Sequence, residues 1–220
     1  MATVTWGQTT TASSLSSVNL NNSGTFDNRY DGVKGSPFMM EQWYKGILYS
    51  NNEKPLIIPH LNFDRHSRSL CFREEDGGKT RVLNKYLVPS FLLIDAGGDS
   101  LKFYLDRLPG ENDQVYLEQI HRGSCLLGLD RAKEFVAADF EQVYSQDRRY
   151  DEFKDKAVFY LKLDAKAPYI AVKKNKKKSA QIFGKLGPEV LKYLKTEDIR
   201  LDSREGVLAM VLYYEKLLAE

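Results

Sequence analysis

From Gly35 onward, short apolar runs alternate with clusters of Gly, Pro, Asn, Asp and Ser. Runs rich in aliphatic and aromatic residues between such clusters are typical of antiparallel strands. Leu101, Phe103 and Leu105 share one face of such a run, and polar residues share most of the other. Strands are predicted at 44–49, 56–64, 69–74, 79–84, 90–95, 101–108, 114–122, 125–130, 157–164 and 169–174.

The C-terminal part has the longer period of helices. A helix is expected to begin near Ser179, which is a candidate N-cap, and Pro188 suits the first turn of a second piece, 189–195. Asp202 or Ser203 can cap a last helix through Leu218. Its predicted inward positions are Val207, Met210, Val211, Tyr214 and Leu217 or Leu218. The polar stretch 137–155 is predicted to be a long loop with at most one helical turn.

The predicted fold class is α+β, mostly antiparallel, with nine or ten strands in a barrel-like sheet or a sandwich and two C-terminal helices. Residues 1–34 are rich in Ser, Thr and Asn with little apolar periodicity, and they are predicted to be a flexible or extended arm. Residues 35–220 are predicted to be a single β-rich domain, helical from about residue 179.

Composition narrows the class of protein. The 220 residues are 42% hydrophobic and carry a net charge of +2, which provides no long-range field to attract nucleic acid. The apolar runs are too short for a membrane-spanning helix, so any membrane association is expected to be peripheral or through a partner. Cys71 and Cys125 are expected on inward strand faces as small buried hydrophobes; one disulfide between them is the alternative.

The N-terminus resembles the end of a secretory signal. Gly7 precedes Gln8 after a short apolar stretch, and a tract of Ser, Thr and Asn follows. A cleaved export signal ahead of about Gln8 is therefore expected. This predicts an exported protein in the periplasm, at the outer membrane or at the cell surface.

The sequence contains few candidates for catalytic or metal-binding residues. His60, Asp64 and His66 would share a strand face, but 65–68 has turn composition, and a metal needs three or four convergent ligands. His121 and Cys125 would lie about 13 Å apart on a strand, too far for base activation of the thiol. No nucleotide-binding, metalloprotease or hydrolase motif occurs. We therefore predict no catalytic residue, no metal and no cofactor.

Residues 173–178 form the one dense run of charge. Its lysines are Lys173, Lys174, Lys176, Lys177 and Lys178. The run is either a patch for phosphate, anionic lipid or nucleic acid, or a solvated strand end whose lysines blunt a sheet edge. Without interleaved aromatic residues it does not favour nucleic acid.

Several segments together resemble a known group. Gly35-Ser-Pro-Phe38 is followed by Trp43-Tyr-Lys-Gly-Ile-Leu-Tyr49, by a strand ending in Leu61-Asn-Phe-Asp64 and by Leu70-Cys-Phe72. With a β meander, a lysine-rich stretch and two C-terminal helices, the pattern over most of 35–220 resembles uncharacterised exported proteins of Bacteroidota-type bacteria. The resemblance implies a cell-envelope location and no known activity.

The function hypothesis is a non-enzymatic partner-binding or accessory subunit of an outer-membrane protein assembly. Its predicted contacts are spaced apolar anchors that a groove or a sheet edge could take up. They are Leu15, Val18, Leu20, Phe26 and Tyr30 in the arm, with Trp43 in the domain. One alternative is a β-barrel that binds a lipid or glycan in its mouth or against Trp43, Tyr44 and Tyr104. The other is an enzyme whose site has no known motif.

Overall fold

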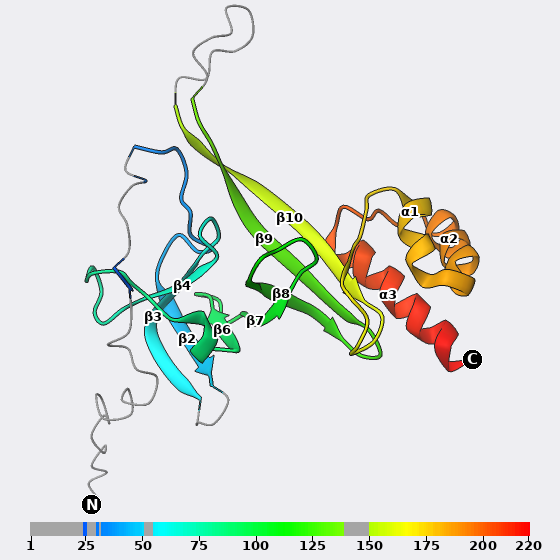
Figure 1. The fold of residues 1–220 in the computed structure, drawn as a ribbon, viewed down its shortest axis with the longest axis horizontal. Coiled ribbons are helices and arrows are strands. Elements are labelled where there is room, and N and C mark those ends of the chain that lie inside the picture. The colour runs from blue at the N-terminus through cyan, green and yellow to red at the C-terminus, as the bar shows by residue number, and fades with distance from the viewer. Residues whose placement is uncertain (1–23, 26–29, 31, 51–54, 139–149) are drawn as a thin grey trace, which may run out of the picture.

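The chain folds as one curled antiparallel sheet with helices at its C-terminal end (Figure 1). The computed structural model describes residues 24–25, 30, 32–50, 55–138 and 150–220. Their eleven strands have the order β1-β5-β4-β3-β2-β6-β7-β8-β9-β10-β11, so β1 and β11 are the two edges of a half-barrel. The predicted α+β, mainly antiparallel fold class is confirmed.

The element bounds are as follows. The strands are β1 Gly24–Thr25, β2 Tyr44–Tyr49, β3 Leu56–Asp64, β4 Ser69–Arg73, β5 Arg81–Val82, β6 Ser90–Ile94, β7 Ser100–Arg107, β8 Gln114–Arg122, β9 Leu126–Val136, β10 Glu152–Lys162 and β11 Ile170–Ala171. The α-helices are α1 Lys176–Ala180, α2 Gly187–Thr196 and α3 Arg204–Ala219, with 3-10 turns η2 Lys85–Leu87 and η3 Gln181–Leu186.

Two hydrophobic clusters account for most of the buried apolar surface. The first, which we call the aromatic core, fills the curl of β2–β8 around Phe63, Phe91, Phe103 and Tyr116. Phe91 stacks on Phe103 across β6 and β7 with ring centroids 4.8 Å apart. The Tyr116 hydroxyl donates to the carbonyl of Val88 at 2.8 Å, so the one polar group among these rings has a partner.

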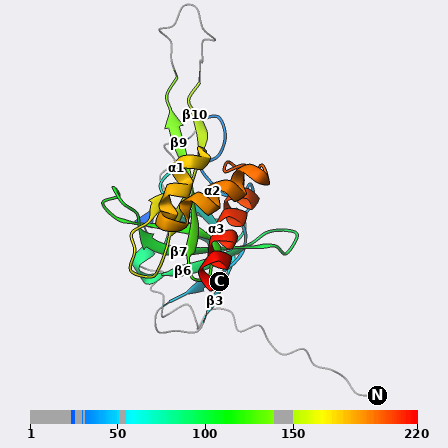
Figure 2. The same cartoon turned by 90° about the vertical axis from the view of Figure 1, so that its right-hand side faces the viewer.

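The second cluster, the helical core, lies between the β8–β10 end of the sheet and the helices (Figure 2). Leu127 of β9 and Leu161 of β10 face Val190 of α2 and Val207 of α3 across it, and all four are fully buried. Side chains at a spacing of three and four residues form one stripe of α3, as the sequence pattern predicts. The stripe is Val207, Met210, Val211 and Tyr214.

Gly46 is required where β2 enters the sheet. A Cβ placed on this residue would lie 2.2 Å from the Leu61 side chain and 2.8 Å from the Leu92 carbonyl. The register of β2 also shifts between Tyr44 and Gly46 against β3. Only glycine allows both neighbouring strands to approach the bulged chain this closely.

Of the two predicted helix N-caps, the one at Ser179 is wrong and the one at Ser203 is confirmed. The first helix begins at Lys176 rather than near residue 179, because the side chain of Asn175 accepts from the Lys178 amide. Ser179 is not the cap; its hydroxyl is buried and bonded to the backbone of Lys173. Ser203 does cap α3, and Pro188 does lie in the first turn of α2. No helix in the described ranges is both long and apolar enough to cross a membrane.

The β9–β10 hairpin is longer than its sequence pattern indicates. Residues 131–136 pair in register with 152–157, although 131–136 received no strand prediction and 152–155 was expected to lie in a loop. The two strands extend past the rest of the sheet (Figure 1), where much of their surface meets water. A ribbon exposed in this way is rich in charged side chains and lacks an apolar alternation. Most of the predicted loop, 139–149, is outside the described residues.

Two other predicted strands are short. Only Arg81 and Val82 of the expected strand 79–84 pair, because Asn84 already caps the 3-10 turn η2 through the Tyr86 amide. Of 169–174 only Ile170 and Ala171 pair, because the following lysines belong to the loop that enters α1.

Removing an aromatic ring from the aromatic core should lower the free energy of unfolding much more than removing one from the surface. We expect Phe103→Ala to lower the free energy of unfolding by about 3–5 kcal/mol, because Phe103 is fully buried and the hole cannot refill. Phe135→Ala, at a ring that is 37% exposed, is the control and should cost less than about 1 kcal/mol. Denaturant titration measures both, and equal losses would contradict this core.

Candidate functional site

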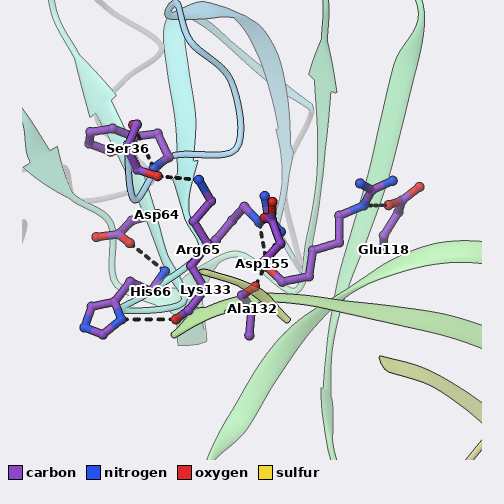
Figure 3. A network of polar contacts seen from close by, with 10 residues as sticks. Ser36, Asp64, Arg65, His66, Glu118, Ala132, Lys133 and Asp155 are labelled. Carbon is purple, nitrogen blue, oxygen red and sulfur yellow. Dashed lines mark hydrogen bonds and ion pairs between the residues drawn. The ribbon is translucent and has the colours of Figure 1, made fainter. Parts of the chain in front are cut away.

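Segments far apart in the sequence meet at the base of the β9–β10 hairpin (Figure 3). They are residues 34–38, the turn 65–68 between β3 and β4, and the middle of β9 and β10. We call this region the hairpin base. Its members are Tyr30, Lys34, Ser36, Asp64, Arg65, His66, Arg131, Ala132, Lys133, Phe135, Phe153 and Asp155.

The segment 34–38 passes from one strand of the hairpin to the other. The Lys34 amide donates to the carbonyl of Asp151 at 2.8 Å, and the Phe153 amide donates to the carbonyl of Lys34. Two residues later the Ser36 carbonyl accepts from the ammonium group of Lys133 on β9. Gly35, at φ +88°, makes the bend between these contacts, a left-handed conformation that favours glycine.

The turn between β3 and β4 lies against the outer edge of β9. Arg65 Nε donates to the Arg131 carbonyl at 2.9 Å, and the Lys133 amide donates to the Arg65 carbonyl at 3.1 Å. The same guanidinium forms an ion pair with Asp155 on β10 at 2.7 Å. Arg65 therefore holds both strands of the hairpin, and its partial burial lowers the pKa of the guanidinium from its usual value.

His66 completes this edge. Its Nδ1 lies 3.1 Å from the carbonyl oxygen of Lys133. Because a carbonyl only accepts, Nδ1 must carry a hydrogen, which fixes the tautomer of the neutral ring. The turn itself is made by Asp64, whose Oδ1 accepts from the amides of His66 and Ser67 at 2.9 and 3.0 Å. The predicted turn at 65–68 is confirmed.

An aromatic cluster covers the outer part of the hairpin base. The ring of Tyr30 packs edge-on against His66 and Phe153, with centroid distances of 5.4 and 5.2 Å. Phe153 also contacts Phe135 at 6.0 Å. Phe135 and the nearby Tyr150 are 37% and 42% exposed, so aromatic surface remains in contact with water.

Glu118 connects the hairpin base to the helices. Its fully buried carboxylate accepts from Arg131 on β9 with one oxygen and from Arg204, the first residue of α3, with the other. Arg131 is also the residue whose carbonyl binds Arg65. One chain of charge-assisted contacts therefore runs from α3 through the sheet to the hairpin.

Of the predicted partner-binding residues, the structure places two. Leu15, Val18, Leu20 and Phe26 lie outside the described residues. Tyr30 belongs to the aromatic cluster. Trp43 is half-buried just before β2, with Phe38 packed edge-on and the Arg73 guanidinium 4.2 Å from its ring centroid.

His121 and Cys125 are brought together through a residue that sequence reasoning missed. Glu215 of α3 bonds His121 Nε2 at 2.8 Å with one oxygen and accepts from the Cys125 amide at 2.8 Å with the other. The thiol itself faces the Leu163 carbonyl at 3.6 Å. Burial, followed by the charge of Glu215, raises the pKa of Cys125 to about 11, so the thiol stays protonated near neutral pH.

Both cysteines are buried and free, as the favoured interpretation of the sequence has it. Cys71 lies in β4, and burial raises the pKa of its thiol as well. Across the described ranges no three His, Cys, Asp or Glu side chains gather as a metal site would require. His60 pairs with Arg73 between β3 and β4, whereas His66 contacts the hairpin.

The predicted anion patch lies away from the hairpin base, at the entry to α1 (Figure 1). Lys173, Lys174, Lys177 and Lys178 are exposed, and Lys176 forms an ion pair with Asp198 at 2.9 Å.

Sequence reasoning did not single out Arg65, Lys133, Asp155, Glu118 or Arg204. Only Glu118 leaves a signal in the sequence. It shares a face with Tyr116 and Ile120 in a period-two strand, so a carboxylate stands where an apolar residue is expected. The other four are charged residues in polar surroundings, and contacts across 66 or more residues give them their partners.

Neutralising Glu118 should loosen α3 and the hairpin together. We expect Glu118→Gln to lower the free energy of unfolding by about 1–3 kcal/mol, because Arg131 and Arg204 lose their shared counter-charge. Faster amide exchange should appear in the first turn of α3 and near Arg131. Glu134→Gln, on the exposed part of β9, is the control. Equal exchange in both variants would contradict the bridging role.

Thiol labelling tests the burial of the cysteines. We expect both to react slowly with a thiol reagent near pH 8 in the folded protein and quickly in denaturant, because the side chains are buried and their pKa values are raised. A Cys125→Ser variant shows which part of the labelling reaction belongs to Cys71 and which to Cys125. Fast labelling of either thiol without denaturant would contradict the structure.

Comparisons with protein-family models, with curated proteins and with solved structures find no match to this chain. The resemblance to exported Bacteroidota-type proteins therefore stays a prediction from the sequence pattern. Function has to be argued from the geometry of the hairpin base and of the surfaces around it.

Proposed function

We propose that the chain is a non-enzymatic, exported subunit that binds a protein partner within a cell-envelope assembly, with the hairpin base as its contact surface. The observation that carries this proposal is the partly exposed aromatic cluster on a braced, projecting ribbon. Aromatic side chains in rigid surroundings are the commonest centres of binding energy in protein interfaces. Here the cluster consists of Tyr30, His66, Phe135 and Phe153, with Tyr150 beside it.

The bracing supports this function because a pre-ordered surface loses little entropy on binding. Arg65 holds β9 and β10 from one side, and residues 34–36 hold them from the other. The Lys34 ammonium group donates to the Tyr150 hydroxyl at 3.1 Å and lies 4.5 Å from its ring centroid. The exposed rings are therefore fixed in position before any partner arrives.

The predicted arm adds to the same surface. Tyr30, the last of its proposed anchors, packs on His66 and Phe153, so this residue of the predicted arm lies against the cluster, whereas Gly24–Thr25 pair with β5 at the edge of the sheet. The export signal and the envelope location rest on the sequence around Gln8 and on the resemblance over 35–220.

The small-ligand alternative receives less support. The inside of the curl is filled by Phe63, Phe91, Phe103 and Tyr116. Of the aromatic residues proposed for ligand contact, Trp43 is packed between Phe38 and Arg73. The Tyr104 hydroxyl is bonded to that of Tyr169 at 3.1 Å.

Capture of partners from the source membrane tests the proposal. Tagged native protein is compared with the double variant Phe135→Ala, Tyr150→Ala, and with Tyr86→Ala, Leu87→Ala, which removes exposed side chains of η2 instead. We expect the first pair to weaken recovery of a specific partner about tenfold or more, since hot-spot rings cost over 1 kcal/mol each. The second pair should leave recovery unchanged.

Deletion of residues 1–30 is the companion experiment, because it removes the arm together with Tyr30. A folded domain that loses its partner supports the proposal. Unchanged recovery with both the deletion and the hairpin variants would refute it. N-terminal sequencing of the mature protein tests export separately, and a chain that begins at Met1 in the cytosol would contradict it.

A further inference from the structure

Charge is distributed very unevenly along this chain. Residues 162–195, which we call the lysine lobe, contain ten lysines and two carboxylates, Asp164 and Glu189, for a net charge of +8. The whole chain carries +2, so the remaining residues carry −6. In the fold, the lobe comprises the end of β10, β11, α1, η3 and α2, at the opposite end of the long axis from β2–β5 (Figure 1).

The densest part of the lobe, 173–178, has a fixed backbone. The buried Ser179 hydroxyl donates to the Lys173 carbonyl at 2.6 Å and accepts from the Lys173 amide at 2.9 Å. Asn175 caps the helix through the Lys178 amide at 3.0 Å. The lysines therefore stand on an ordered loop and helical turn, and their charges do not disperse with a flexible tail.

Most of these ammonium groups face water without a counter-charge. Lys173, Lys174, Lys177 and Lys178 are exposed, as are Lys185, Lys192 and Lys195. Carboxylates pair with two of the ten lysines, Lys176 with Asp198 and Lys162 with Asp106. Among the described residues none of the seven exposed lysines forms an ion pair, so a positive surface remains.

The kind of cation indicates the kind of partner. The lobe has ten lysines and no arginine. Arginine forks and exposed aromatic rings favour phosphates of nucleic acid, but Tyr169 and Phe183 are buried and Tyr193 stacks on Tyr213 at 4.0 Å. Lysine point charges suit a surface whose negative charge is spread over a plane of lipid headgroups, which needs no fixed geometry.

We propose that the lysine lobe docks on an anionic lipid surface, as a peripheral electrostatic contact. This contact rests on the charges and exposure of the lobe alone, and it is separate from the protein-binding surface at the hairpin base. Each lysine near such a surface strengthens partition about fivefold, and the attraction extends over roughly one Debye length of about 10 Å. Docking should therefore be reversed by salt.

Vesicle sedimentation with the full chain tests this. Phosphatidylcholine vesicles with and without phosphatidylglycerol are compared at about 0.05 M and about 0.5 M salt. We expect the protein to pellet with the anionic vesicles at low salt only. Equal pelleting with both lipids, or none with either, would overturn the proposal.

Matched variants locate the contact. Lys173→Gln, Lys177→Gln, Lys178→Gln together should weaken partition about 100-fold, since three lysines are lost. Lys45→Gln, Lys79→Gln, Lys102→Gln together make the same change of net charge at exposed positions of β2, of the loop before β5 and of β7, and should have little effect. An equal loss in both triples would overturn the assignment to the lobe.

Two further measurements separate the competing explanations. Tighter binding of single-stranded DNA or polyglutamate than of anionic vesicles at the same salt would assign the lobe to another class of partner and refute the lipid proposal. Phe135→Ala, Tyr150→Ala should leave vesicle binding intact, so failure of the hairpin as a protein-binding surface is distinguishable from failure of the lobe as a lipid-binding one.

Discussion

The arrangement of this protein depends on one buried carboxylate. Glu118 is fully buried between the aromatic core and the helical core, and it accepts from Arg131 and from Arg204. A carboxylate taken out of water is unfavourable unless charged donors satisfy it. Because its donors lie on β9 and at the start of α3, satisfying Glu118 fixes the helices relative to the sheet.

Arg131 connects the Glu118 ion pairs to the β9–β10 hairpin. Arg131 binds Glu118 through its side chain and Arg65 through its carbonyl, and Arg65 then pairs with Asp155 on β10. Without these contacts, the backbone N–H and C=O groups along the two edges of the β9–β10 ribbon would have only water as a hydrogen-bond partner. Arg65, His66 and residues 34–36 occupy parts of these edges and brace the ribbon where it carries the aromatic cluster.

The two surfaces differ in the physics of recognition. The hairpin base offers apolar rings already held in position, suited to a partner with a complementary shape. The lysine lobe offers exposed charges on an ordered backbone, suited to a diffuse negative surface. In the proposed arrangement, the hairpin binds a protein partner while the helical end, which lies apart from it, contacts lipid.

The sequence by itself determined most of the strands, the start of α3 at Asp202 or Ser203, the place of Pro188 in the first turn of α2 and the inward stripe of α3, because period and turn chemistry are local properties. The sequence also favoured buried cysteines but left a disulfide between them open. The sequence could not determine the outer hairpin, where the mainly charged segments 131–134 and 152–156 carry no apolar alternation and pair only because the inner strands set their register. The sequence could not identify the partners of Arg65, Glu118 and Glu215 either. Each of these three residues makes at least one contact with a residue 66 or more positions away in the chain. Only the tertiary structure brings such charges together, because the burial that makes each pairing necessary exists only after the sheet has curled and the helices have packed on it.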